Sequence, residues 1–238
     1  MFRKNKKNTE PLPTVAAIIP AAGSSTRMGQ NKLMLPLMDT PVLAHTISAF
    51  ERCSLVRDII LVCREQDILP YSGLISDFGF HKVRHVLRGG QTRAHSVLAG
   101  LHACAPDIDF VAIHDGARPL VSDKLILQTL QTAFAEGAAA PIVPVKDSVK
   151  QIQNGKIIAD VPRDSIAAVQ TPQVFRRSQI ADSLRESIAA NAALTDDCAA
   201  VERIGVSVAA VSGEYRNLKI TTPEDITIAE LFLTQEDL

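Results

Sequence analysis

The 238-residue sequence contains no tryptophan, and aromatic residues make up only 4% of it. Proteins that bind single-stranded nucleic acid stack bases on aromatic side chains, so this composition argues against that class. Neither sign of charge is in excess, with 25 Lys and Arg against 26 Asp and Glu. Because no net field draws the chain to nucleic acid or to an anionic membrane, any anionic ligand must be bound by locally placed cations.

Long hydrophobic runs are also missing, and no apolar stretch reaches the roughly 18 residues that a membrane-spanning helix needs. The sequence starts with a basic stretch, but the apolar segment Val15–Ala22 after it is short and contains Pro20, which argues against a secretory signal. We expect residues 1–14 to form a polar tail.

The cysteines lack the C-x-x-C spacing of a metal or redox site. They are Cys53, Cys63, Cys104 and Cys198. Buried free thiols in a reducing compartment are the ordinary state of such residues. We therefore expect a cytoplasmic protein.

Apolar runs of strand length alternate with helical periodicity along the chain. The runs are Val15–Ile19, Asp58–Cys63, Val83–Leu87, Phe110–Ile113, Ala138–Val145 and Val206–Val211. Helices are predicted after Thr40-Pro41, over Ala94–Leu101, from Ser122 to Gly137, from Ser178, from Thr195 and after Thr222-Pro223. This alternation predicts one three-layer α/β domain over residues 15–238, with a mostly parallel sheet.

A polar stretch, Lys146–Asp164, interrupts this alternation. It has Asn154-Gly155 at its centre, and Asn-Gly between weakly alternating runs is the strongest short-range signal of a β-hairpin. We interpret residues 146–166 as a two-stranded arm that leaves the domain.

A loop of small residues follows the first strand and carries Arg27, Gly29 and then Lys32. Five residues separate Gly23 from Gly29, which excludes a P-loop, and Ser25 excludes the G-x-G-x-x-G dinucleotide loop. Exposed N–H groups with two nearby cations suit a polyphosphate. The alternative is an ordinary turn whose cations face solvent.

Five blocks of the sequence occur in the order of a known family. They are Ala21–Gly29 with Lys32, Gly89-Gly90 with Arg93 and Ser96, His114–Pro119, Val169–Gln173 and Asn217–Asp225. The first resembles the loop of nucleotide-sugar pyrophosphorylase-like nucleotidyltransferases. Together, over residues 15–233, they resemble the 2-C-methyl-D-erythritol 4-phosphate cytidylyltransferases of non-mevalonate isoprenoid biosynthesis. The resemblance implies a Rossmann-like nucleotidyltransferase fold with a mixed sheet.

The resemblance also implies the chemistry: a phosphate oxygen of methylerythritol phosphate attacks the α-phosphorus of CTP, and pyrophosphate leaves. By the family pattern, Arg27, Lys32 and Lys219 are expected to be catalytic. The expected nucleotide-binding residues are Ala21, Ala22, Gly23, Gly90, Arg93, Ser96 and Asp115. Asp115 follows an apolar strand, where ligands gather in open α/β sheets, and it is also the candidate ligand for Mg²⁺. The alternative is that Asp115 merely pairs with Arg118.

The second substrate is expected to bind partly across a homodimer formed through the arm, again by resemblance. The residues implied are Arg118, Ser148, Arg163, Thr171, Thr195 and Asp196. Other interpretations stay open: Arg163 as a solvated arm cation, and Thr195 as a helix cap. The histidines are assigned to packing or to the surface.

The sequence departs from the family pattern at three places. Ser148 and Gly116 stand where threonine and alanine are usual, and Asn31 and Leu33 flank Lys32 in place of the usual Pro and Gln. Two rival functions remain at this stage. One is a ribitol- or pentitol-phosphate cytidylyltransferase of the teichoic-acid type, and the other is an inactive nucleotide-binding relative.

Overall fold

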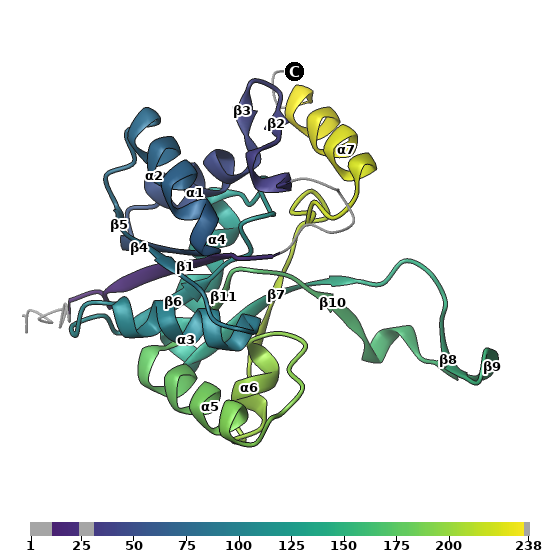
Figure 1. Ribbon diagram of the computed structural model, residues 1–238. Coiled ribbons are helices and arrows are strands. Elements are labelled where there is room, and N and C mark those ends of the chain that lie inside the picture. The colour runs from purple at the N-terminus through teal and green to yellow at the C-terminus, as the bar shows by residue number, and fades with distance from the viewer. Residues whose placement is uncertain (1–10, 24–30, 236–238) are drawn as a thin grey trace, which may run out of the picture.

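An eight-stranded mixed sheet forms the centre of the molecule in the computed structural model, which describes residues 11–23 and 31–235 (Figure 1). Its strands are β1 (Val15–Ala21), β4 (Val56–Cys63), β5 (Val83–Arg88), β6 (Phe110–Ile113), β7 (Ala138–Pro144), β10 (Ala167–Val169), β11 (Gln173–Arg176) and β12 (Ala209–Ser212). The order is β10-β7-β11-β6-β1-β4-β5, with β12 paired to β7. Strands β6, β1, β4 and β5 are parallel, as are β12 and β7, whereas β10 and β11 run antiparallel to their partners.

Helices cover both faces of this sheet, which confirms the three-layer prediction (Figure 1). One face carries α1 (Val42–Arg52), α2 (Ile68–Asp77), α4 (Asp123–Glu136) and α7 (Pro223–Thr234). The other carries α3 (Arg93–Ala103), α5 (Arg177–Ala189) and α6 (Cys198–Glu202). Strand β1 packs Ala17 and Ile19 into the first core and Ala16 and Ile18 into the second, so its continuous apolar run is buried on both sides.

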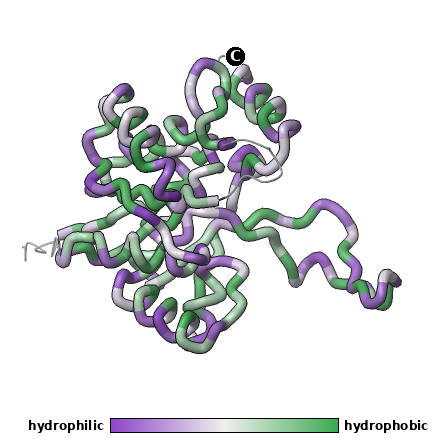
Figure 2. Tube along the Cα trace, in the orientation of Figure 1, coloured by the Kyte–Doolittle hydropathy of each residue, from purple (hydrophilic) through white to green (hydrophobic). Residues whose placement is uncertain are grey.

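The predicted hairpin is present and projects away from the sheet (Figure 1). Strands β8 (Val149–Gln153) and β9 (Lys156–Val161) pair antiparallel. Asn154 and Gly155 both have positive φ angles, of 51° and 72°, as a two-residue type I′ turn requires. Figure 2 shows hydrophobic segments among hydrophilic ones along this arm. The name "arm" is kept for residues 146–166.

Several boundaries differ from the prediction for local reasons. Thr40 pairs with Leu37 in a small ladder, so α1 begins at Val42 and Thr40 does not cap it. The helix expected from Thr195 begins at Cys198. The small ladder joins β2 (Pro36–Leu37) to β3 (Thr40–Pro41), and short 3₁₀ turns are η2 (Lys32–Met34), η3 (Glu65–Asp67) and η4 (Arg163–Ser165).

Helix α2 was missed, because Pro70 and Gly73 are typical of loops. The structure places Pro70 in the first turn of the helix, where its missing N–H has no helical partner to lose.

The late strand expected from Val206 begins at Ala209. Residues 1–10 of the expected tail lie outside the described part of the chain. Within that described part, no helix is long and apolar enough to cross a membrane.

Candidate active site

A cavity of about 250 Å³ opens at the carboxyl ends of β1, β5 and β6. This edge is where open parallel sheets bind ligands. The described residues that line it include nine that the sequence places in the site: Ala21, Ala22, Gly23, Lys32, Gly90, Arg93, Ser96, Asp115 and Lys219. Arg27 lies outside the described residues. Parts of the chain that are far apart in sequence therefore meet here.

Close packing explains the paired glycines on one wall of the cavity. A Cβ on Gly90 would lie 2.3 Å from the Cβ of His95, and one on Gly89 would lie 2.5 Å from the Ser96 hydroxyl. Ser96 accepts a hydrogen bond from the Gly90 N–H at 3.2 Å and donates one to the Thr92 carbonyl at 3.1 Å. The first turn of α3 thereby fixes the loop, and the spacing between Gly90 and Ser96 follows from this contact.

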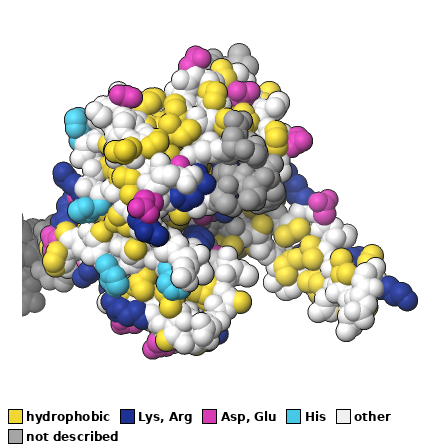
Figure 3. Space-filling model, viewed as in Figure 1, with side chains coloured by type: hydrophobic (Ala, Val, Ile, Leu, Met, Phe, Trp, Pro, Cys, Tyr) yellow, Lys and Arg dark blue, Asp and Glu magenta, His cyan; other side chains and the backbone are white. Residues whose placement is uncertain are grey.

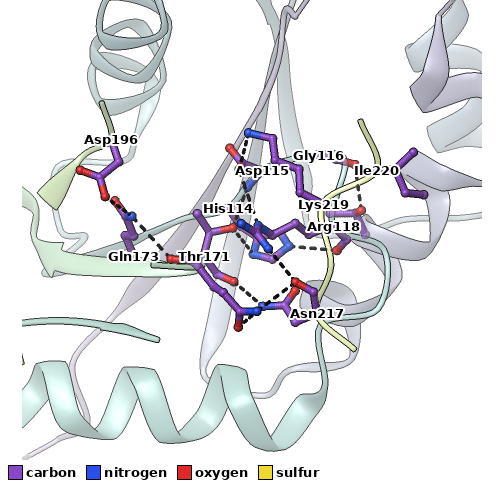
Figure 4. Close-up of polar contacts among 12 residues, drawn as sticks. His114, Asp115, Gly116, Arg118, Thr171, Gln173, Asp196, Asn217, Lys219 and Ile220 are labelled. Atoms are coloured by element: carbon purple, nitrogen blue, oxygen red, sulfur yellow. Dashed lines mark hydrogen bonds and ion pairs between the residues drawn. The ribbon is translucent and has the colours of Figure 1, made fainter. Parts of the chain in front are cut away.

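Asp115 is buried next to the end of β6 and faces three cations. The Lys219 ammonium lies 2.9 Å from its Oδ2 atom, and Arg118 approaches the same carboxylate to 3.7 Å (Figure 4). Arg93 approaches its other oxygen to 3.5 Å. Burial opposes ionisation, but Lys219 and Arg93 outweigh it and hold the pKa of Asp115 below its usual range. Asp115 is therefore a stable carboxylate, and its pairing extends well beyond Arg118.

The Val169–Gln173 block holds the segment that carries Lys219. Gln170 bonds both backbone groups of Glu214, donating at 2.8 Å and accepting at 3.2 Å, and the Asn217 amide donates to the Thr171 carbonyl at 2.9 Å. The Arg118 guanidinium donates to the Asn217 carbonyl at 2.6 Å (Figure 4). These bonds place Lys219 beside Asp115 although the two residues come from different parts of the chain.

His114 lies directly before Asp115 and is fully buried. Thr171 Oγ1 accepts the Asp115 N–H at 3.1 Å, so its own proton is free to be donated to His114 Nδ1 at 3.1 Å. The other ring nitrogen, Nε2, then donates to the Arg118 carbonyl at 3.1 Å. Burial lowers the pKa of His114 to about 4, in agreement with a neutral ring. The sequence assigned the histidines to packing or the surface and missed this link, although His114 stands inside the block that it identified.

Lys32 reaches the same region from the opposite end of the chain. Its ammonium donates to the Ile220 carbonyl at 2.6 Å. Asn31, which replaces the usual proline, accepts the Leu33 N–H and bonds Asp67 and Tyr71, which lie at the start of α2. The Asn31 side chain, which departs from the family pattern, is therefore fixed by its own hydrogen bonds.

A family model described as 2-C-methyl-D-erythritol 4-phosphate cytidylyltransferase matches residues 15–235. The chain belongs to this family. A relative of that name from Geotalea uraniireducens is 44% identical, with 92% of this chain and 96% of the relative covered. One from Caldanaerobacter subterraneus subsp. tengcongensis is 41% identical, with 92% and 98% covered.

Solved structures agree with the cytidylyltransferase family fold. The 4-diphosphocytidyl-2C-methyl-D-erythritol synthase of Anaerococcus prevotii superimposes with a TM-score of 0.84 at 32% identity, covering 93% of this chain and 96% of that one. The 2-C-methyl-D-erythritol 4-phosphate cytidylyltransferase of Thermus thermophilus gives 0.76 at 28% identity, covering 91% and 98%.

The residues that the cytidylyltransferase pattern assigns to the second substrate fall into two groups. Thr195 and Asp196 line a second cavity of about 230 Å³ that shares Arg93 with the first. Asp196 is held there by the Gln173 amide at 2.9 Å. Arg118 and Thr171 do not line the first cavity themselves but contact Asp115, which does.

Ser148 and Arg163 form the other group and lie on the exposed arm. Arg163 donates to the carbonyl of Lys146, also on the arm, at 3.0 Å. Within one chain these two residues do not line either cavity. One chain therefore does not bring these two residues to either cavity, and their contact with substrate stays a prediction.

Proposed function

We propose that this chain joins CTP to 2-C-methyl-D-erythritol 4-phosphate, giving 4-diphosphocytidyl-2-C-methyl-D-erythritol and pyrophosphate. The observation that carries the proposal is the buried carboxylate of Asp115 at the carboxyl ends of the parallel strands. Lys219, Arg93 and Arg118 surround it. Lys32 approaches the same segment through Ile220. This arrangement supplies several cations to one small volume in a chain with a net charge of −1.

The geometry suits an in-line phosphoryl transfer, which depends on positioning and charge stabilisation rather than on covalent chemistry by the protein. Lys219 would neutralise charge on the α-phosphate, while Lys32 and Arg27 would hold the β- and γ-phosphates. Ala21–Gly23, Gly90 and Ser96 would frame the cytidine. A general base is not needed, because the second ionisation of a phosphate monoester has a pKa near 6, so the attacking oxygen is already largely ionised.

We also propose that Mg²⁺ accompanies the triphosphate. Within the described part of the chain, no three His, Cys, Asp or Glu side chains gather as a metal cage would require. Mg²⁺ commonly combines one or two carboxylates with substrate phosphates and water. Asp115 would be its carboxylate where the triphosphate also offsets the charges of Lys219, Arg93 and Arg118. Bound there, Mg²⁺ would offset negative charge on the phosphates. We expect calorimetry to show that CTP binds the protein more tightly with Mg²⁺ than with EDTA, and equal affinity would contradict this proposal.

The arm is proposed to form a homodimer that brings Ser148 and Arg163 to the second cavity of the partner. Its support is exposed apolar surface: Ile152 and Ile157 are 70% and 69% exposed, and Figure 3 shows hydrophobic side chains across the arm. Exposed apolar surface of this kind marks an interaction site.

All four cysteines are buried free thiols, which agrees with the proposed cytoplasmic location.

The arm proposal predicts that charge on this surface separates the subunits. We expect the double substitution Ile152→Asp and Ile157→Asp to convert a dimer into a folded monomer, because both side chains lie outside the central cores. Light scattering measures the mass, and circular dichroism checks the fold. An unchanged dimer would contradict the proposal.

Pyrophosphate release with CTP and Mg²⁺ tests the main function. We expect turnover with 2-C-methyl-D-erythritol 4-phosphate and much less with ribitol 5-phosphate at equal concentration. Turnover with ribitol 5-phosphate but not with 2-C-methyl-D-erythritol 4-phosphate would assign the chain to teichoic-acid chemistry. Binding of CTP without turnover on either acceptor would identify an inactive relative.

A further inference from the structure

Asp197 lies beside the site, and no block of the sequence assigns it a task. Its side chain is 1% exposed, and its Oδ2 atom lies 2.6 Å from the Arg93 guanidinium. The same guanidinium approaches Asp115 at 3.5 Å through its other terminal nitrogen. Arg93 therefore bridges two buried carboxylates, and it lies closer to Asp197 than to Asp115.

Arg93 occupies a boundary, since it lines both the first cavity and the second cavity that contains Thr195 and Asp196. Asp197 lines the second cavity only. Its own position is rigid, because the Gln173 amide oxygen accepts the N–H groups of Asp197 and Cys198 at 3.0 and 3.1 Å. The ion pair between Asp197 and Arg93 thus forms part of the wall between the two cavities.

We propose that Asp197 is a positioning residue that holds Arg93 in this wall and so leaves Asp115 to Lys219. The inference rests on the proposed function for its kinetic consequence. Without the charge of Asp197, the guanidinium would turn fully to Asp115 and form a two-pronged pair with it. Lys219, which lies 2.9 Å from Asp115 and is 43% exposed, would then lose its fixed place. The second cavity would lose its wall at the same time.

The burial of Asp197 makes its partner necessary. Burial raises the pKa of Asp197, and the positive charge of Arg93 opposes this rise. A buried carboxylate that loses its cation is strongly destabilising, whereas removal of both partners together is much less so. The pair can therefore be tested by substituting each partner alone and then both.

The experiment is a double-mutant cycle of Asp197→Asn, Arg93→Gln and their combination, with kcat and KM measured for both substrates. We expect Asp197→Asn to lower kcat roughly tenfold with the KM for CTP changed by less than about threefold, the pattern of a lost transition-state arrangement. In the Arg93→Gln background, Asp197→Asn should cause no further loss, because Asp197 acts through Arg93. The matched control is Asp182→Asn, which breaks an exposed Asp–Arg pair on α5 and should leave kcat unchanged.

A second readout needs no substrate, so it separates failure of this inference from failure of the proposed function. We expect Arg93→Gln to lower the melting temperature, and the double variant to recover part of that loss. A tenfold effect of Asp197→Asn that persists without Arg93 would overturn the proposal. It would also be overturned if KM and kcat were unchanged in folded Asp197→Asn. If Asp197→Asn does not fold, a folded double variant supports the proposal and an unfolded one overturns it.

Discussion

Asp115 shows, at the scale of a residue, how a buried carboxylate keeps its charge. Burial of such a group is unfavourable unless opposite charges compensate for it, and here Lys219, Arg93 and Arg118 surround it. The same group of charges creates a site for anions, because three cations share one carboxylate. A ligand with phosphate groups would complete the balance.

Lys219 provides the first prediction at this scale. We expect Lys219→Ala to lower kcat by about 10²-fold or more, since it removes the charge that we propose stabilises the reacting phosphate. The fold should remain, because Asp115 keeps Arg93 and Arg118. Steady-state kinetics and a thermal melt measure the two effects. Lys124→Ala, on an exposed position of α4, serves as the control, and wild-type turnover in Lys219→Ala would contradict the assigned role.

His114 predicts how stability depends on pH. Its pKa is about 4 in the folded chain against 6.5 for an unperturbed histidine, so the unfolded chain binds the proton more readily between these values. Stability from this group is complete above pH 6.5 and is lost as the pH falls toward 4. Urea unfolding should show a loss of about 2 kcal/mol from pH 7 to pH 5.

The control for this effect is His114→Gln, which keeps a donor toward the Arg118 carbonyl and has no proton to gain. We expect the variant to be less stable at pH 7 and to lose less stability on acidification. If it showed the same acid sensitivity as the wild type, other groups would be responsible.

Local signals in the sequence were sufficient for several elements. Ser122 caps α4 by accepting the Leu125 N–H, Gly137 ends that helix with a φ of 91°, and Asn154-Gly155 makes the hairpin turn. Each depends on residues next to one another in the chain. Strands β10 and β11 were not predicted, because they are three and four residues long and depend on pairing with distant strands.

The start of α7 carries a prediction at the scale of an element. Asp225 accepts hydrogen bonds from the Thr221 N–H, the Thr221 hydroxyl and the Thr222 N–H, at 2.7 to 2.8 Å. We expect Asp225→Ala to lower the free energy of unfolding by about 1–2 kcal/mol, because these donors lose their acceptor at a helix N-terminus. Calorimetry should show a melting temperature lower by roughly 2–8 °C. Thr227→Ala, at an exposed position of the same helix, should have little effect, and an equal shift in both variants would contradict this account.

Some residues of the site were likewise predicted from the sequence, whereas others were recognised only in the structure. The resemblance to the family pointed to Lys32, Asp115 and Lys219, and the structure brings all three to one cavity. It did not identify Asp197 or the task of Gln170, because their partners lie far away in the sequence. Sequence blocks shared with a family thus predict which groups line a cavity. The bonds that hold those groups require the tertiary structure.

At the scale of the whole molecule, the arm predicts that each site combines two chains. If Arg163 serves the partner's site, dimers of Lys219→Ala and dimers of Arg163→Ala are both inactive. A mixed dimer has one site with both substitutions and one with neither. Random exchange makes half of the dimers mixed, so we expect about a quarter of the wild-type activity to return. Pyrophosphate assay after co-refolding measures it. No recovery would place Arg163 in its own chain's site, and an active Arg163→Ala dimer would place Arg163 outside catalysis.

Lys32 contacts Ile220, next to Lys219, across 188 positions of the sequence. This separation affects the order in which the parts of the site are synthesised. A ribosome releases β1 and Asp115 well before the segment that Gln170 holds. A nascent chain at that stage has a carboxylate without its lysine, and a cavity with one wall missing. The cavity therefore gains Lys219 only after the last strand of the sheet, β12, has been made, and any shorter chain lacks the lysine beside Asp115.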